Sequence, residues 1–359
     1  QEQLVDRAIR ASVLDLIDAL YEQGFGPVIV AGPDRAFLPD SLSVVHDVDQ
    51  GEFHFGARLA GLIEHHALSP VVYFGAGSTP LLSPDLLGLL QGMLCEAEFG
   101  QRGRIPAHIA LTNNLHSSDW VGLSHTADAV SIIREADRDN SLAWMLHQGT
   151  YDVRVLSGVR PSSSMDMDTP ADLAIVRLHP QCSPRLAEVL GDPMLERVPV
   201  EQVLDGAARD GNRIALLGRV SPRAWRALSD VTQAWIRTYS EERGMVASGR
   251  LQRGEARSLL VRLLELLGPD GFFDELARVA DVAIIDSRVM MAACGHYPSA
   301  ADRFASDLFL PDQITDEWVR AFTVAAANAP MPVLLGGHGV VAGGLYVLAE
   351  LIAARRGIR

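Results

Sequence analysis

The chain has 359 residues, of which 48% are hydrophobic and 21% charged, enough for two globular domains with full cores. Its formal net charge of −14 argues against a nucleic-acid partner, because phosphate backbones are bound by basic patches. No apolar run is long enough to cross a bilayer, and the polar start lacks the pattern of a signal peptide, so no membrane association is expected. Three widely spaced cysteines, Cys95, Cys182 and Cys294, show no disulfide or metal spacing, and we expect a cytoplasmic protein.

Helical and strand patterns alternate along the first half of the chain. Apolar residues at helical spacing predict helices over residues 4–23, 55–66, 85–98 and 140–147. Short apolar runs between turn residues predict buried strands over residues 26–33, 42–47, 70–75, 107–112 and 152–156. Strands that alternate with helices form mostly parallel sheets with helices on both faces. We therefore predict an α/β domain of this architecture over residues 1–180.

The pattern changes near residue 180, where two prolines break the preceding helix. Helical spacing then dominates and predicts helices over residues 222–243, 254–267 and 340–356. Two apolar runs predict strands at residues 279–286 and 331–335. Residues 181–359 are therefore predicted to form a second, mainly helical α/β domain.

The predicted strand at residues 70–75 runs into a glycine-rich bend. The sequence Gly75-Ala76-Gly77-Ser78-Thr79 is followed by Pro80-Leu81-Leu82-Ser83-Pro84, which opens the next helix. In open α/β sheets ligands bind beyond the carboxyl ends of strands, where missing side chains let a phosphate approach the backbone. We therefore expect Gly75, Gly77, Ser78 and Thr79 to bind a phosphorylated ligand.

A second motif, Asp166-Met167-Asp168-Thr169-Pro170-Ala171-Asp172-Leu173, lies about ninety residues further on. An Asp or Thr before a Pro at the first helical position, with Asp172 in the first turn, is by itself a good helix-capping sequence. In this order the two motifs resemble those of the MobA-like nucleotidyltransferases, which share the GT-A fold. The resemblance covers roughly residues 4–180.

The resemblance implies an enzyme that transfers a nucleotidyl group from an NTP to a phosphate or hydroxyl group of a small acceptor, with release of pyrophosphate. It implies that Asp166 is a catalytic ligand of Mg²⁺, and that Asp168 either joins it as a metal ligand or caps the helix. The C-terminal domain is then expected to contribute an acceptor or dimer surface, which would make the protein a homo-oligomer.

Two departures from the family pattern leave an alternative open. Ser78 stands where the family carries a metal-binding Asp, and a hydroxyl cannot ligate Mg²⁺ as a carboxylate does. The family's opening glycine-rich loop is not found, since residues 30–35 contain a proline and no lysine, and the resemblance places that loop upstream of Gln1. The alternative is a catalytically silent protein of the same fold that binds a phosphorylated metabolite or serves as a scaffold.

The polar residues 112–120 follow another predicted strand. They are typical of a hydrogen-bonded loop, because Asn, Ser and Asp favour turns. They also allow Asn113, Asn114, His116 and Asp119 to form an acceptor or metal site, with Asp119 as a catalytic substitute for the missing carboxylate. The adjacent His65 and His66 are expected to point in different directions from a helix, which argues against a shared metal.

A second glycine-rich turn, Gly336-Gly337-His338-Gly339, joins a strand to a helix in the C-terminal domain. Such turns bind anions or simply allow close packing. Together with Arg288, His296 and Arg303, the turn predicts a pocket for a phosphate or carboxylate, and a third interpretation places a separate enzyme there. A helix packed tightly over the glycines would argue against that interpretation.

Overall fold

The computed structural model describes residues 1–99, 108–156, 161–295 and 297–358. It confirms an α/β protein whose strand pairs are largely parallel. The chain forms two compact units, an N-terminal unit of residues 10–164 and a C-terminal unit of residues 1–9 and 165–359. The units thus divide at residue 164, whereas the sequence pattern changes near residue 180. We describe each unit by itself.

The N-terminal unit holds two sheets. Its elements are the larger part of α1 (Glu2–Glu22), then β1 (Ile29–Gly32), β2 (Val45–Val48), α2 (Phe55–His66), β3 (Val71–Phe74), α3 (Pro84–Phe99), β4 (Ile109–Thr112), β5 (Trp120–Leu123), α4 (Thr126–Arg134), η1 (Asp139–Ser141), α5 (Leu142–Gln148), β6 (Asp152–Val155) and η2 (Pro161–Ser164). Strands β1 and β2 pair in parallel as a separate two-stranded sheet. The larger sheet has the order β3-β5-β4-β6, with β5 antiparallel to both neighbours and β4 parallel to β6.

Alternating side chains of the larger sheet build two cores. On one face, Ala110, Val121 and Leu123 pack with apolar residues of α2, α4 and α5. On the other face, Leu111 and Trp120 pack with leucines of α1 and α3. Because successive residues of a strand point to opposite faces, the short strands β4 and β5 are buried on both sides.

The C-terminal unit contains one parallel sheet. Its elements after the start of α1 are α6 (Pro170–Val176), α7 (Pro184–Leu190), η3 (Pro193–Arg197), α8 (Val200–Ala208), β7 (Arg213–Gly218), α9 (Pro222–Val231), β8 (Trp235–Ser240), α10 (Leu259–Val279), β9 (Val282–Asp286), α11 (Ser287–Ala293), α12 (Ala300–Asp307), η4 (Pro311–Gln313), α13 (Glu317–Ala327), β10 (Val333–Gly336), η5 (His338–Val341) and α14 (Gly343–Arg356). All strand pairs in the order β10-β9-β7-β8 are parallel.

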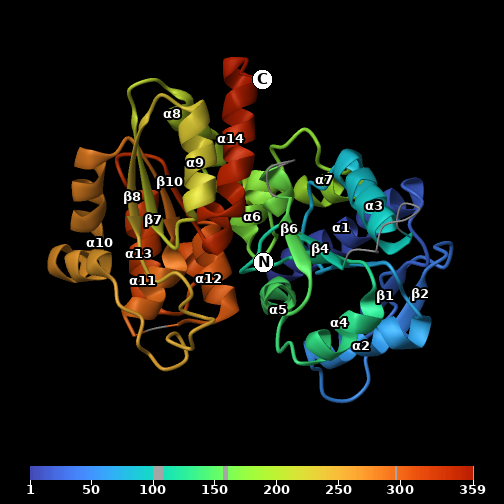
Figure 1. The fold of residues 1–359 in the computed structure, drawn as a ribbon. Helices are drawn as coiled ribbons and strands as arrows, with labels where there is room; N and C mark the ends of the chain where they lie inside the picture. Colours follow the sequence, from blue (N-terminus) through green and yellow to red (C-terminus); the bar gives the residue numbers. More distant parts are fainter. Residues whose placement is uncertain (100–107, 157–160, 296, 359) are drawn as a thin grey trace. The chain divides into compact units, whose positions relative to one another are not determined.

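Helices cover both faces of this parallel sheet. Figure 1 shows α8, α9 and α14 on one side of the strands and α10 and α13 on the other. Leu217, Ile285 and Leu335 point toward α10 and α13, where they pack with Phe273 and Phe322. The chain runs outward from β7 to β8 and then returns to the other side of β7 for β9, so the strand order reverses between β7 and β9. Such a switch point is a common place for a ligand.

The predicted elements of the N-terminal half are confirmed with small shifts. Two expectations for the C-terminal half were wrong, and the strands β5 and β7 were missed. Residues 222–243 are not one helix, because α9 ends at Val231 and the edge strand β8 follows. Residues 254–267 become a helix only from Leu259, and α10 then continues beyond a break at Gly268, where φ is 72°. Strand β3 lies antiparallel to β5, a strand that no sequence pattern predicted.

Helix α1 has 21 residues, and α10 spans 21 residues with a break at Gly268. Within the residues that the structure describes, no helix combines the length and the apolar character that a membrane span requires.

Candidate functional site

The glycine-rich bend follows β3 at the edge of the larger sheet of the N-terminal unit. The backbone N–H of Gly75 donates a hydrogen bond to the carbonyl of Asp119 over 3.0 Å. Both the N–H and the hydroxyl of Ser78 donate to the carbonyl of Gly75, over 3.1 and 2.7 Å. Since Ser78 is also only 5% exposed, we assign its hydroxyl to holding the bend together.

Gly77 and Thr79 give the bend its unusual backbone. Both are in the left-handed region, with φ of 84° and 56°. This conformation is easy for glycine and strained for a β-branched residue. Thr79 is only 3% exposed, and its hydroxyl has no hydrogen-bond partner among the described residues. Such strain persists only where the surrounding structure enforces it, and it gathers at functional sites.

The polar loop after β4 meets the bend. Strands β3 and β4 both pair antiparallel with β5, so their carboxyl ends lie at the same edge of the sheet. The side chain of Asn113 fixes the loop, because its Nδ2 donates to the Asp119 carboxylate over 2.5 Å and its Oδ1 accepts from the Asp119 N–H over 3.1 Å. Asn113 is buried, whereas Asn114 and His116 are exposed.

A third segment, η1, packs against this loop. The hydroxyl of Ser118 donates to the carbonyl of Asp139 over 2.8 Å, and the Asn140 amide donates to the hydroxyl of Ser117 over 3.3 Å. The Asp139 carboxylate in turn accepts the hydroxyl of Tyr73, which lies on β3, over 3.4 Å. Three segments far apart in the sequence therefore converge at the carboxyl ends of β3 and β4.

We call the solvent-reaching residues of these three segments the strand-end site, consisting of Gly75, Asn114, His116, Asp119 and Asp139. A Cβ atom on Gly75 would lie 3.3 Å from the Asp119 carbonyl oxygen and 3.5 Å from the Asp139 carboxylate. Gly75 is thus closely surrounded by two acidic residues and is itself only partly exposed. Partly exposed carboxylates at the carboxyl ends of strands suit a divalent cation and the phosphate group that it carries.

An aromatic surface adjoins the strand-end site. The ring of His116 lies against the indole of Trp144, with centroids 4.8 Å apart and planes tilted by 40°. Trp144 belongs to α5, directly after η1, and is 40% exposed. An accessible indole is a suitable platform for a flat ring such as a nucleobase.

The structure brings four of the predicted residues together, namely Gly75, Asn114, His116 and Asp119. It assigns Ser78 and Asn113 to internal hydrogen bonds. Sequence reasoning missed Asp139 and Trp144. The signal in the sequence was the run of five polar residues at 137–141, which is equally typical of an ordinary exposed loop.

Asp166 and Asp168, the metal ligands that the family resemblance implies, belong to the C-terminal unit. The Asp166 carboxylate accepts the N–H of Met167 over 2.9 Å. Helix α6 is capped by Thr169 and not by Asp168, because the Thr169 hydroxyl and the Asp172 carboxylate each accept the other residue's backbone N–H. The prediction of Asp168 as the cap was therefore wrong, while the metal-binding role of both residues remains a prediction.

The second glycine-rich turn lies under α6. A Cβ atom on Gly337 would come within 3.0 Å of Cγ2 of Thr169, and one on Gly339 within 2.1 Å of Oδ1 of Asp172. Gly336 likewise approaches α6 closely. A helix is thus packed tightly over these glycines, and we assign them to packing rather than to an anion. Burial, followed by the negative charge of Asp168, raises the pKa of Asp172 to about 8.

The arginines predicted beside this turn are already engaged. Arg288 donates two hydrogen bonds to Asp307, over 2.7 and 2.6 Å, and the two side chains are 5% and 0% exposed. The Arg303 guanidinium lies over the ring of Tyr297, 4.7 Å from its centroid. His296 lies outside the described residues. The expectation that Arg288 binds a ligand anion was therefore wrong, because Asp307 already neutralises its charge.

His338 lies beside an ion pair that sequence reasoning missed. Arg219, after β7, donates to Asp286, at the end of β9, over 2.6 and 3.0 Å. Burial opposes ionisation of Asp286, but the guanidinium outweighs it and lowers the pKa of that carboxyl. Dense surrounding protein, followed by the charge of Arg219, lowers the pKa of His338 to about 4, although the residue itself is exposed. His338 is thus neutral near pH 7 and adds no cation here.

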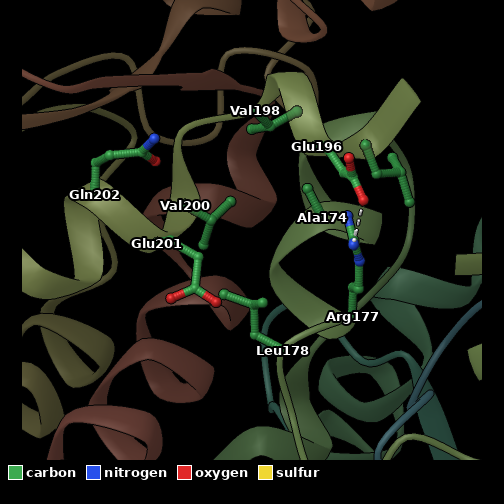
Figure 2. A pocket seen from close by; sticks show the side chains of 9 residues that line it. Ala174, Arg177, Leu178, Glu196, Val198, Val200, Glu201 and Gln202 are labelled. Carbon is green, nitrogen blue, oxygen red and sulfur yellow. Dashed lines mark hydrogen bonds and ion pairs between the residues drawn. The ribbon is translucent and has the colours of Figure 1, made fainter. Parts of the chain in front are cut away.

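A small pocket opens elsewhere in the C-terminal unit, between α6, η3 and α8. Its volume is about 180 Å³, less than the roughly 300 Å³ at which ligand pockets usually begin. Figure 2 shows Arg177 and Glu196 joined by an ion pair on its wall, 3.0 Å apart. None of its lining residues was predicted to act on a ligand, and the strand-end site remains the better candidate.

Comparison with known proteins adds no family to this description. No family model matches the chain, and no curated protein is significantly similar to it.

Proposed function

We propose that the N-terminal unit is a GT-A-like nucleotidyltransferase domain that binds an NTP at the strand-end site. The observation that carries the proposal is the hydrogen bond from the Gly75 N–H to the Asp119 carbonyl, 3.0 Å long. It joins the glycine-rich bend, which carries the family resemblance, to the polar loop that supplies a carboxylate.

The residues of the strand-end site match the parts of a nucleotide. The partly exposed carboxylates of Asp119 and Asp139 suit a cation that carries the phosphates, and the exposed indole of Trp144 beside His116 suits the base. The carboxylates of Asp119 and Asp139 would repel phosphates on their own. They therefore favour a ligand that arrives with a cation.

The same carboxylates fit Mg²⁺, which is usually bound by one or two carboxylates together with substrate phosphates. Asp119 and Asp139 would hold it, since the Ser78 hydroxyl is bonded to Gly75. When bound, the ion neutralises charge on the phosphates of the nucleotide.

The proposed reaction is a substitution at the α-phosphorus of the NTP. An oxygen of the small acceptor forms a bond to that phosphorus, and the bond from phosphorus to the bridging oxygen of the β-phosphate breaks. Pyrophosphate leaves with the bonding electron pair. The proton of a hydroxyl acceptor passes to a carboxylate of the site, whereas a phosphate acceptor brings no proton that must be removed.

A silent relative of such enzymes is the second candidate. It is favoured by Ser78, which stands at the family's Asp position and is buried in the bend with its hydroxyl bonded to the Gly75 carbonyl. This candidate binds a phosphorylated metabolite at the same strand-end site but transfers nothing.

Calorimetric titration of the full chain with ATP, GTP, CTP and UTP, each with Mg²⁺, tests the proposal. We expect binding of at least one nucleotide, weakened at least about tenfold by Asp119→Asn or Asp139→Asn, because each removes one charge from the cation site. Asp152→Asn is the matched control, since Asp152 lies on the same unit and pairs only with Arg154 in the described structure.

Absence of heat with all four nucleotides would refute the nucleotide proposal. If a nucleotide binds, pyrophosphate release is measured with a panel of small phosphorylated and hydroxyl acceptors. Release that depends on Asp119 supports the transferase, whereas binding without release from any acceptor supports the silent relative.

A further inference from the structure

A second polar cluster of the N-terminal unit lies away from the glycine-rich bend. Asp47 is on β2, and His65 and His66 are the last two residues of α2. Each offers one ligand atom, and the three atoms lie within 4.8 Å of one another. Among the residues that the structure describes, this is the one group of three or more His, Cys, Asp or Glu side chains with such spacing.

Two of the three atoms are already at ligand spacing. Nε2 of His66 and Oδ2 of Asp47 are 3.0 Å apart, close to the roughly 3.3 Å between neighbouring ligands of a tetrahedral zinc ion. The His65 ring meets the His66 ring edge-to-face, with centroids 4.6 Å apart. Because His65 is exposed, its ring can rotate and bring its nitrogen closer to the other two ligand atoms. The nitrogen would have to move by at most about 1.5 Å to reach the ideal spacing.

The sequence argued against a metal shared by two adjacent histidines of one helix. Their Cβ atoms do diverge around the helix. Both residues, however, stand in the last turn of α2, which ends at the left-handed residue Ala67. Their imidazoles extend beyond the helix toward Asp47, and the long rings bring together nitrogens whose Cβ atoms point apart.

The surroundings of the cluster favour a cation. Arg58 binds Oδ1 of Asp47 over 2.9 Å and Oδ1 of Asp49 over 2.8 Å. This contact orients the Asp47 carboxylate and leaves its Oδ2 toward the histidines, as hydrogen bonds around metal-binding carboxylates do. With neutral histidines, two carboxylates and one guanidinium leave a net charge of −1 to attract a divalent ion.

We propose that Asp47, His65 and His66 form a binding site for Zn²⁺ or a similar divalent transition metal ion. Two imidazoles and one carboxylate are a ligand set that zinc prefers, whereas Mg²⁺ and Ca²⁺ prefer oxygen ligands alone. Three protein ligands leave the fourth position for water. The ion joins the end of α2 to β2. This site is separate from the strand-end site, and its existence does not depend on the proposed nucleotide activity.

Titration of the metal-free full chain with ZnCl₂ tests the proposal, with Co²⁺ as a spectroscopic probe of coordination. We expect one Zn²⁺ per chain, and a visible Co²⁺ spectrum of a four- or five-coordinate ion. His65→Ala removes one ligand and should weaken zinc binding at least about tenfold. Asp47→Asn should weaken it similarly. The matched control is His147→Ala, another exposed histidine of the same unit, which should bind zinc as the wild type does.

Folding of the variants is checked separately. Because His65 is exposed, His65→Ala should unfold at the wild-type temperature without metal. Zinc should raise the unfolding temperature of the wild type and of His147→Ala more than that of His65→Ala. The proposal is refuted if zinc does not bind, or if it binds equally to the wild type and to His65→Ala. It is also refuted if His147→Ala loses as much affinity as His65→Ala, which would indicate adventitious binding to surface histidines.

Discussion

The two units both end a strand in a glycine-rich turn, but they use the glycines differently. After β3, Gly75 is partly exposed, and Asp119 and Asp139 also reach solvent. After β10, the glycines lie against α6, and the arginine nearby, Arg288, is buried in an ion pair. The sequence motif is similar in both places, so the presence of glycines does not distinguish a ligand site from a packing contact.

The two cases differ in the burial and the hydrogen-bond partners of the polar side chains beside the glycines. Near the turn after β10, Arg288 pairs with Asp307 and Arg219 with Asp286 inside the protein, and His338 is exposed. In the N-terminal unit internal hydrogen bonds consume Ser78 and Asn113 but leave carboxylates at the surface. A glycine-rich strand end is therefore a ligand candidate where polar side chains beside it remain accessible.

The largest effect is expected from opening the buried ion pair of the C-terminal unit. Arg288→Met should lower the free energy of unfolding by about 3–5 kcal/mol, because Asp307 is left charged and unpaired at 0% exposure. Urea denaturation measures the loss. Arg226→Met, which breaks only an exposed pair with Asp230 on α9, should cost no more than about 0.5 kcal/mol.

The double variant Arg288→Met with Asp307→Leu should recover most of that stability, since two apolar side chains replace both charges. A small loss in Arg288→Met alone would show that Arg288 is not committed to Asp307. The distinction between the tightly packed turn after β10 and the partly exposed bend after β3 would then fail.

The next effect compares the glycines directly. Gly339→Ala places a Cβ atom 2.1 Å from Oδ1 of Asp172 and should destabilise the protein by about 3 kcal/mol, the upper end of ordinary overpacking. Gly75→Ala meets its nearest neighbour, the Asp119 carbonyl oxygen, at 3.3 Å and should cost less than about 1 kcal/mol. Gly61→Ala, on α2 with nothing within 4 Å, is the control and should be neutral or stabilising. Equal losses in Gly339→Ala and Gly75→Ala, measured by urea denaturation, would contradict the distinction.

The sequence was sufficient for some parts of the fold with strong local patterns, although the buried strand β7 was missed despite its apolar run. Strand β3 is a short apolar run, and α3 begins where Pro84 follows Ser83, so both were predicted nearly to the residue. Strand β8 was missed because it is a largely exposed edge strand, in which Trp235 and Tyr239 point outward and no buried run forms. Its polar alternation resembled the exposed face of a helix.

The candidate site was predictable only in part. Gly75 directly follows one predicted strand and Asp119 lies in the polar run after another, and those local signals identified them. Their hydrogen bond depends on β5 pairing between β3 and β4, which no local pattern showed. Asp139 enters through tertiary packing against Ser118. The contact of Asp172 with Gly339 joins residues of α6 and η5, and sequence spacing cannot reveal it.

The smallest expected effect, taken per pH unit, concerns the carboxyl of Asp172, which lies on α6 and packs against Gly339. The pKa of Asp172 is raised from 3.8 to about 8. Below about pH 4 this carboxyl is protonated in both the folded and the unfolded chain, so its contribution to the stability of the fold is fully present. As the pH rises toward 8 the unfolded chain releases this proton and the folded chain keeps it, and stability falls by up to about 1.4 kcal/mol per pH unit. Asp172→Asn keeps an oxygen acceptor for the Thr169 N–H but cannot ionise, so its unfolding free energy should change less steeply between pH 5 and pH 8. Asp230→Asn, at an exposed position of α9, should keep the wild-type slope. Parallel slopes in the wild type and Asp172→Asn would mean that solvent reaches this carboxyl, and that the turn after β10 is as open as the bend after β3.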